Sequence, residues 1–238
     1  MRTLALALLA MIATGATPHA LAQGTPAARP AARPAAAPPA STPIPAKWQA
    51  GRHYRLLNPA VPNTIAPGKV EVVEVFWYGC GACYMLDPYL ESWKKTKPAA
   101  AELVRLPVTW NDSAKRHAKL FYALQALKQD GRLHTKVFDS IHRGGNGLIA
   151  RDDASTLALQ RDWAKANGVD PTAFTNAWNS MSVDVKLRQA DDLVRRYRVE
   201  GTPAMIINGK YFTDINSAGG VPQMLELINA LVAAETRR

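Results

Sequence analysis

The sequence predicts a mixed α/β fold in which one small sheet is interrupted by a long helical segment. Two strand signals, at residues 70–77 and 102–110, stand on either side of a first helix. Helical periodicity then continues through residues 113–197, and strand signals return only near the C-terminus. There, Asn208-Gly209 joins two short apolar runs and is typical of a hairpin turn. The expected order is strand, helix, strand, helical block, hairpin and helix.

The first 22 residues have the features of a cleaved secretory signal peptide. Arg2 gives a positive start, residues 4–13 are apolar, and Ala20-Leu21-Ala22 is a small-x-small cleavage site. The apolar run is shorter than the roughly 20 residues that cross a bilayer. The residue directly after the cleavage site is Gln23 and not a cysteine, so we expect no lipid anchor. We expect residues 1–22 to be removed and the mature chain to lie outside the reducing cytosol, where a disulfide can persist.

The next segment, residues 23–47, is predicted to be a spacer. Residues 24–46 contain seven prolines and nine alanines, a composition that fixes the backbone and offers little to bury. It shows no apolar periodicity of the kind that a folded dimerisation module would need. The globular domain is therefore expected to cover residues 48–238.

The charge balance excludes some functions for this domain. The chain has 29 basic and 19 acidic residues, a net charge of +10. Four of the basic residues precede Trp48 and all the acidic ones follow it, which leaves the domain with 25 basic and 19 acidic residues. The basic residues stand in small groups and not along an aromatic-lined stripe. We therefore expect a solvated surface and no nucleic-acid binding.

Each element of the domain is predicted by its own pattern. Residues 70–77 are β-branched and aromatic, as in a central strand. Helical spacing begins directly after the cysteine pair, in a helix that Pro88 should kink. Asp170-Pro171 has the pattern of an N-cap followed by a proline in the first turn. The remaining expectations are helices at residues 120–127, 133–142, 153–167 and 183–197, strands at 204–207 and 211–213, and a closing amphipathic helix at 224–232.

The two cysteines, Cys80 and Cys83, are separated by Gly81-Ala82, and such a pair can bind a metal or close a disulfide. A structural zinc needs four ligands, and the five histidines show no zinc-finger spacing, so we expect no metal site. An inert structural disulfide is the other alternative, although so short a loop constrains the unfolded chain little. The start of a helix favours a thiolate at Cys80, which is the reactive form.

Three segments together resemble the DsbA family of periplasmic thiol-disulfide oxidoreductases. They are Glu74-Val-Phe-Trp-Tyr-Gly-Cys-Gly-Ala-Cys83, the Tyr-Met-Leu-Asp-Pro-Tyr-Leu-Glu that follows it, and Gly201-Thr-Pro-Ala-Met-Ile-Ile-Asn-Gly209. The resemblance covers nearly all of residues 48–238 and does not include the spacer. It implies a thioredoxin fold with a helical insertion at about residues 113–197.

The resemblance also implies roles for five residues. Cys80 would be the exposed sulfur that attacks and is attacked, and Cys83 the buried resolving sulfur. Thr202 and Pro203 would form a cis-proline loop that faces the disulfide. Glu74 would lie beneath the disulfide and handle the proton of the buried thiol. From the residues alone, a glutamate that reaches solvent at the end of the strand stays an open alternative for Glu74.

The dipeptide between the cysteines departs from the pattern of the best-known strong oxidants of the family, which carry Pro-His there. Neither Gly81 nor Ala82 offers a side-chain donor to the sulfur of Cys80. Helix and backbone effects together account for a lowering of the Cys80 pKa by about two units. We therefore expect a lowered but not extreme pKa, and a weaker oxidant than the Pro-His relatives.

The predicted function is that of a periplasmic oxidoreductase that donates its Cys80–Cys83 disulfide to reduced, partly unfolded secreted proteins through a mixed disulfide. We expect it to be a monomer without a cofactor, and a DsbB-like membrane protein to reoxidise it. Two alternatives stay open: a reductase or isomerase of the same fold, and a peptide-binding periplasmic chaperone whose cysteines are redox-idle.

Overall fold

The computed structural model describes residues 42–236. Within this range, one sheet contains β1 (Arg55–Leu56), β2 (Val70–Phe76), β3 (Ala101–Pro107), β4 (Ala204–Ile207) and β5 (Tyr211–Thr213). The helices in this range are α1 (Gly81–Thr96), α2 (Asp112–Ala126), α3 (Asp130–His142), α4 (Asp153–Ala166), α5 (Pro171–Trp178), α6 (Met181–Arg196), α7 (Ile215–Ala218) and α8 (Val221–Glu235). Apart from β1 and α7, the element order agrees with the one expected from the sequence.

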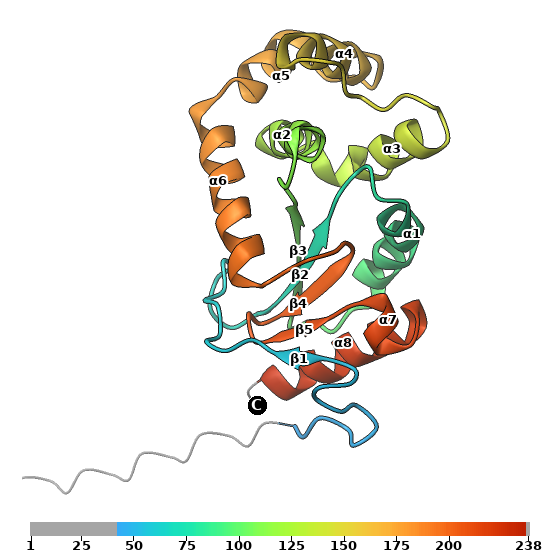
Figure 1. Cartoon of the computed structure of the whole chain (residues 1–238), viewed down its shortest axis with the longest axis vertical. Coiled ribbons are helices and arrows are strands. Elements are labelled where there is room, and N and C mark those ends of the chain that lie inside the picture. The colour runs from blue at the N-terminus through green and yellow to red at the C-terminus, as the bar shows by residue number, and fades with distance from the viewer. Residues whose placement is uncertain (1–41, 237–238) are drawn as a thin grey trace, which may run out of the picture. The chain divides into compact units, whose positions relative to one another are not determined.

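The sheet has the strand order β1-β5-β4-β2-β3, with β2 between its parallel neighbour β3 and its antiparallel neighbour β4 (Figure 1). All seven residues of β2 are buried, which explains why β-branched and aromatic residues fill five of its seven positions. Because β2 is hydrogen-bonded to a neighbouring strand on each side, the cysteine pair that follows its carboxyl end is held in a fixed position.

Two apolar clusters lie on the two faces of the sheet. Helices α1 and α8 cover one face, where Val72 and Ile207 pack with Leu90 and Leu231. The other face belongs to a larger cluster that includes Val73, Val75 and residues of α2, α3, α5 and α6. Along β2, Val70 and Val72 belong to the cluster of α1 and α8, whereas Val73 and Val75 belong to the other cluster. Helix α1, which begins at the cysteines, is therefore packed on this face of the sheet together with α8.

Helices α2 to α6 occupy residues 112–196, between β3 and β4 in the sequence. Four of these helices begin at a side-chain N-cap of the kind that the sequence signals, including Asp170 before Pro171 of α5. The other three caps are Asn111, Asp152 and Ser180. That this segment is a separate insertion domain remains our proposal.

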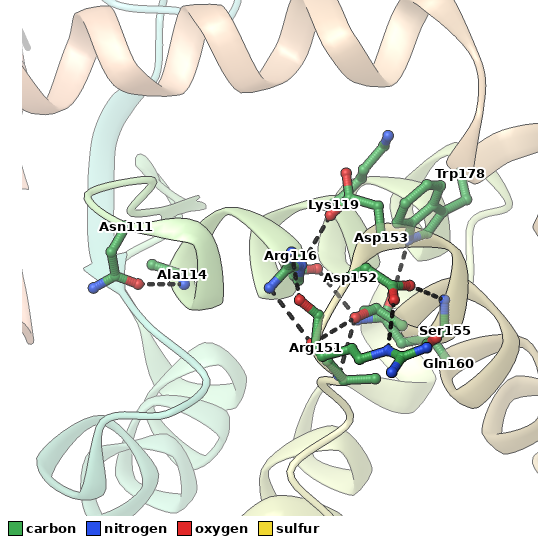
Figure 2. A network of polar contacts seen from close by, with 12 residues as sticks. Asn111, Ala114, Arg116, Lys119, Arg151, Asp152, Asp153, Ser155, Gln160 and Trp178 are labelled. Atoms are coloured by element: carbon green, nitrogen blue, oxygen red, sulfur yellow. Dashed lines mark hydrogen bonds and ion pairs between the residues drawn. The ribbon is translucent and has the colours of Figure 1, made fainter.

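A polar network ties the loop after α3 to the helices around it (Figure 2). The fully buried Gln160 donates to the carbonyl of Leu148 at 2.9 Å and accepts from the indole of Trp178 at 2.9 Å. Arg116 of α2 pairs with Asp153 at the start of α4, with 2.8 Å between Nε and Oδ1. The two bonds of Gln160 satisfy buried polar groups that would otherwise destabilise the insertion, whereas the Arg116–Asp153 pair lies at the surface.

The hairpin turn requires a glycine for a tertiary reason. Asn208 and Gly209 both have positive φ, 52° and 62°, as a two-residue hairpin turn demands. A Cβ on Gly209 would lie 1.8 Å from the carbonyl oxygen of Val61. The Asn-Gly signal in the sequence predicts the turn but not the segment that packs on it.

Some expectations need correction. The second strand ends at Pro107 and not at residue 110, since Asn111 already caps α2. The sequence analysis missed β1 and the short helix α7. Ile44, which was assigned to the spacer, packs against the apolar cluster of α1 and α8. The expected signal peptide, residues 1–22, and most of the spacer lie outside the described residues.

No helix within residues 42–236 combines the length and the apolar character needed to span a bilayer.

Candidate active site

Cys80 is the N-cap residue of α1 and Cys83 lies one turn inside the helix. The backbone of Cys80 is extended, with φ −90° and ψ 116°, and its Sγ accepts a hydrogen bond from the amide of Cys83 at 3.3 Å. Cys80 is half-buried and Cys83 has no exposed surface. Both sulfurs are free, so the structure describes the dithiol form. Only Cys80 is within reach of another protein.

The Thr202–Pro203 segment lies against Cys80, although 122 residues separate them in the chain. It joins the end of the helical segment to β4, and its peptide bond is cis. The carbonyl oxygen of Thr202 lies 3.3 Å from the Sγ of Cys80 and accepts from the thiol. The fold therefore places together the four residues that the resemblance groups at one site.

The environment makes the two sulfurs chemically unequal. A hydrogen bond from the Cys83 thiol lowers the pKa of Cys80 to about 5, with further bonds from Thr202 and from the amides of Cys83 and Ala82; partial burial opposes them. Thr202 acts in both senses, because its carbonyl favours the thiol whereas its hydroxyl favours the thiolate. The donors to sulfur outnumber that one acceptor, so the thiolate prevails. Burial raises the pKa of Cys83 well above its ordinary value.

This lowering exceeds the one expected from the Gly81-Ala82 dipeptide, which was two units or less. The sequence argument counted the helix and the backbone amides and missed two side-chain donors. They are the thiol of Cys83, the largest contribution, and the hydroxyl of Thr202. Hydrogen bonds to a charged acceptor are about twice as strong as neutral ones, so two of them outweigh the absence of a donor at position 82.

Glu74 is fully buried in the middle of β2, which excludes the alternative that it reaches solvent. Its Oε2 pairs with Nε of Arg105 on the neighbouring strand β3 at 3.0 Å, and Oε1 has no hydrogen-bond partner. The same guanidinium contacts Asp87 and Glu91 of α1, at 3.2 and 2.7 Å. Burial raises the pKa of Glu74 to about 7, against the opposing effect of Arg105.

The described contacts of Glu74 are thus with Arg105 and not with either sulfur. Proton transfer between Glu74 and Cys83, which the resemblance implies, stays a proposal.

Helix α3 of the inserted segment holds the loop that precedes Cys80. The hydroxyl of Tyr78 lies 2.9 Å from Nδ1 of His134, and Nε2 of His142 donates to the Tyr78 carbonyl at 2.8 Å. The ring of His142 also stacks on Tyr84, the residue after Cys83, with 4.8 Å between centroids. The sequence analysis tested these histidines only as zinc ligands and missed this role; their spacing of eight along a helix was the available signal.

A groove of about 550 Å³ begins beside the cysteines. Ala82 and Met85 of α1 form one wall and Thr202 and Pro203 another, while Gly81 is exposed at the helix start. The remaining lining residues are Arg55, Glu200, Gly201, Phe212, Asp214, Ile215 and Asn216. Met85 has 67% of its surface exposed, and a large exposed apolar side chain beside a groove is typical of a binding surface. The sequence analysis named Ala82, Thr202 and Pro203 but did not identify a groove, because its lining residues come from four segments that lie far apart in the chain.

No group of three or more His, Cys, Asp or Glu side chains in the described part of the chain is arranged to hold a metal ion.

Known proteins resemble this chain in sequence and in structure. The family model "DSBA-like thioredoxin domain" matches residues 96–228. The thiol:disulfide interchange protein DsbA of Pseudomonas syringae is 34% identical over 187 residues, 79% of this chain and 84% of the relative. The same-named protein of Pseudomonas aeruginosa is 35% identical over 188 residues, with 79% and 86% covered. A crystal structure of Pseudomonas aeruginosa DsbA superposes with a TM-score of 0.72 at 35% identity, over 78% of this chain and 93% of that one. The expected thioredoxin fold is confirmed.

Proposed function

The chain belongs to the DsbA family of thiol:disulfide oxidoreductases, and on that premise we propose that its Cys80–Cys83 disulfide oxidises reduced proteins in the periplasm. One observation carries the assignment of roles: a half-buried Cys80 with a lowered pKa stands before a fully buried Cys83, at the edge of an open groove. A thiolate near neutral pH is both a good leaving group and a stable product.

The reaction starts from the oxidised protein. A substrate thiolate attacks the Sγ of Cys80, a substrate–Cys80 bond forms, and the Cys80–Cys83 bond breaks with its electron pair on Cys83. The raised pKa of Cys83 favours protonation of that sulfur. A second substrate thiolate then attacks the substrate sulfur of the mixed disulfide and expels Cys80 as a thiolate. The substrate loses two electrons and gains a disulfide, and the protein becomes a dithiol.

The thiolate of Cys80 is stabilised by Cys83, by Thr202 and by two amides, so the dithiol product is favoured. Stabilisation of the reduced form is what makes a disulfide oxidising. We propose that a DsbB-like membrane protein accepts the two electrons and restores the disulfide, and that residues 1–22 direct the chain to the periplasm. The groove beside Pro203 is where we place the substrate segment.

The test mixes the oxidised protein with an excess of a reduced dithiol peptide and follows the peptide disulfide by mass spectrometry. We expect one peptide disulfide per protein, and none with Cys80→Ser. The Cys83→Ala variant should accumulate a mixed disulfide at Cys80 when it meets an oxidised peptide. A glutathione equilibrium then gives the potential. A protein that is fully oxidised at glutathione ratios that reduce the peptide would be a reductase, contrary to the proposal.

A further inference from the structure

The groove beside the cysteines has apolar walls and, in addition, a net negative charge. Of the residues that line it, three are charged: Arg55, Glu200 and Asp214. Two negative charges thus face one positive charge. The domain as a whole has more basic than acidic residues. The groove therefore has a local charge opposite in sign to that of the domain that contains it.

The positive charge is already engaged with the protein. Nη2 of Arg55 donates to the carbonyls of Tyr197 and Arg198, at 3.0 and 2.8 Å. Its guanidinium also lies over the ring of Phe212, 3.9 Å from the centroid. These contacts hold Arg55 against the groove wall and leave its charge in place, close enough to interact with Glu200 and Asp214, so the two carboxylates outweigh it by one negative charge.

The two carboxylates are free to meet a ligand. Among the ion pairs within 4.0 Å that the described residues form, none includes Glu200 or Asp214. Glu200 is exposed, directly before the Gly201-Thr202 segment that touches Cys80. Asp214 is half-buried and uses Oδ1 to cap α7 through the amide of Ser217 at 2.7 Å. Its Oδ2 takes part in no hydrogen bond or ion pair among the described residues, and Asp214 lines the groove.

We propose that this groove selects substrate segments in which a lysine or arginine stands near the reactive cysteine. The inference rests on the proposed function and names the class of substrate for that site. The apolar walls, with Met85, Phe212 and Ile215, fit the aliphatic stem of such a side chain, and the carboxylates of Glu200 and Asp214 fit its charged end. An acidic side chain in the same place would meet two like charges and only one cation, Arg55, which is held by backbone carbonyls and by the ring of Phe212.

The test compares three reduced dithiol peptides that differ only at the residues flanking one cysteine, which are lysine, glutamine or glutamate. Oxidation by the disulfide form of the protein is measured as kcat/KM at low and at high ionic strength. The net positive charge of the domain favours the glutamate peptide at long range, so a preference for lysine reports the groove itself. We expect the lysine peptide to exceed the glutamate peptide by about threefold to tenfold at low salt, and less at high salt.

The matched variants separate the groove from the rest of the surface. Glu200→Gln with Asp214→Asn removes both groove carboxylates, and asparagine keeps the cap on α7. Asp162→Asn with Asp192→Asn removes two exposed carboxylates of α4 and α6 and changes the net charge equally. We expect the first pair to abolish the preference and the second to leave it unchanged. Reduction of the disulfide by dithiothreitol, a neutral small molecule, should be the same in the wild type and in the Asp162→Asn, Asp192→Asn control.

The outcomes distinguish the inference from the proposed function. If the wild type oxidises the three peptides at equal rates, or prefers glutamate, the charge selectivity is wrong and the proposed function stands. A lysine preference that survives in the groove variant would place the selectivity elsewhere and overturn the inference. If the wild type oxidises none of the peptides, the proposed function itself fails.

Discussion

The backbone amide of Cys83 donates to the Sγ of Cys80 across 3.3 Å, so the first turn of α1 binds the sulfur that reacts. The same turn buries the second sulfur beneath it, and the Cys83 thiol becomes the largest cause of the lowered Cys80 pKa. This short segment thus gives Cys80 a lowered pKa and a half-buried position, and Cys83 a raised pKa and a fully buried one. The predictions that follow test this asymmetry and the packing that supports it.

Cys80 in the reduced protein should titrate near pH 5. The thiolate absorbance at 240 nm should rise around that pH, and a short pulse of iodoacetamide at pH 7 should label Cys80 alone. The folded pKa is below the ordinary value of 9.0, so this group stabilises the reduced fold above about pH 9 and the stabilisation is lost as pH falls towards 5. Urea unfolding of the reduced wild type and of Cys80→Ser should show this trend in their difference. Equal labelling of both sulfurs would contradict the roles assigned.

Cys83→Ala should make Cys80 less acidic. The variant loses the Cys83 thiol as a donor to the Cys80 thiolate but keeps the helix and the amides. We expect the Cys80 pKa to rise by about one unit or more, measured by the same absorbance titration. Gly81→Ala leaves the Cys83 donor in place, adds no hydrogen-bonding group and would meet nothing within 4 Å of its Cβ, so it serves as the control. An unchanged pKa in Cys83→Ala would mean that the amides alone stabilise the thiolate.

Glu74→Gln should change the pH dependence of the protein near neutrality. Burial raises the pKa of Glu74 to about 7, so the carboxyl favours the fold while it is protonated. Its contribution is fully present below about pH 4.5 and is lost as pH rises through 7. The stability of the wild type relative to Glu74→Gln should therefore fall over that interval in urea unfolding. If Glu74 handles the Cys83 proton, Glu74→Gln should also remove an inflection near pH 7 from the rate of disulfide exchange; an unchanged rate profile would leave Glu74 as a structural group only.

Gln160→Leu should destabilise the inserted helices. The substitution leaves the Leu148 carbonyl and the Trp178 indole without their buried partner (Figure 2). Two unpaired groups of this kind should cost about 2–4 kcal/mol. Gln189→Leu, on the exposed side of α6, should change stability by no more than about 0.5 kcal/mol. Chemical denaturation of both variants measures the difference, and equal effects would show that the network carries no special stability.

Local patterns in the sequence were sufficient for the elements and for the reacting pair. The run of buried residues in β2 and the helical spacing after Cys83 depend on neighbours in the chain, so their periodicity is visible without a structure. The caps at Asn111 and Asp170 are equally local. The two-residue strand β1 has too few residues for any periodicity, and only its pairing with β5 defines it.

The sequence by itself determined that two cysteines lie at a strand-to-helix turn. Cys80 and Cys83 are three residues apart, directly after a strand pattern and at the start of a helical one, and these local patterns need no tertiary contact. The tertiary structure decided part of the acidity of Cys80, because Thr202 reaches it across 122 residues of sequence, whereas the largest contribution comes from Cys83 in the same helical turn. It also decided that Glu74 pairs with Arg105, since strand register and not spacing sets that contact. The groove with Glu200 and Asp214 exists only where β1, α1 and the loops around β4 and β5 meet, and solvent exposure in that place cannot be read from any one segment.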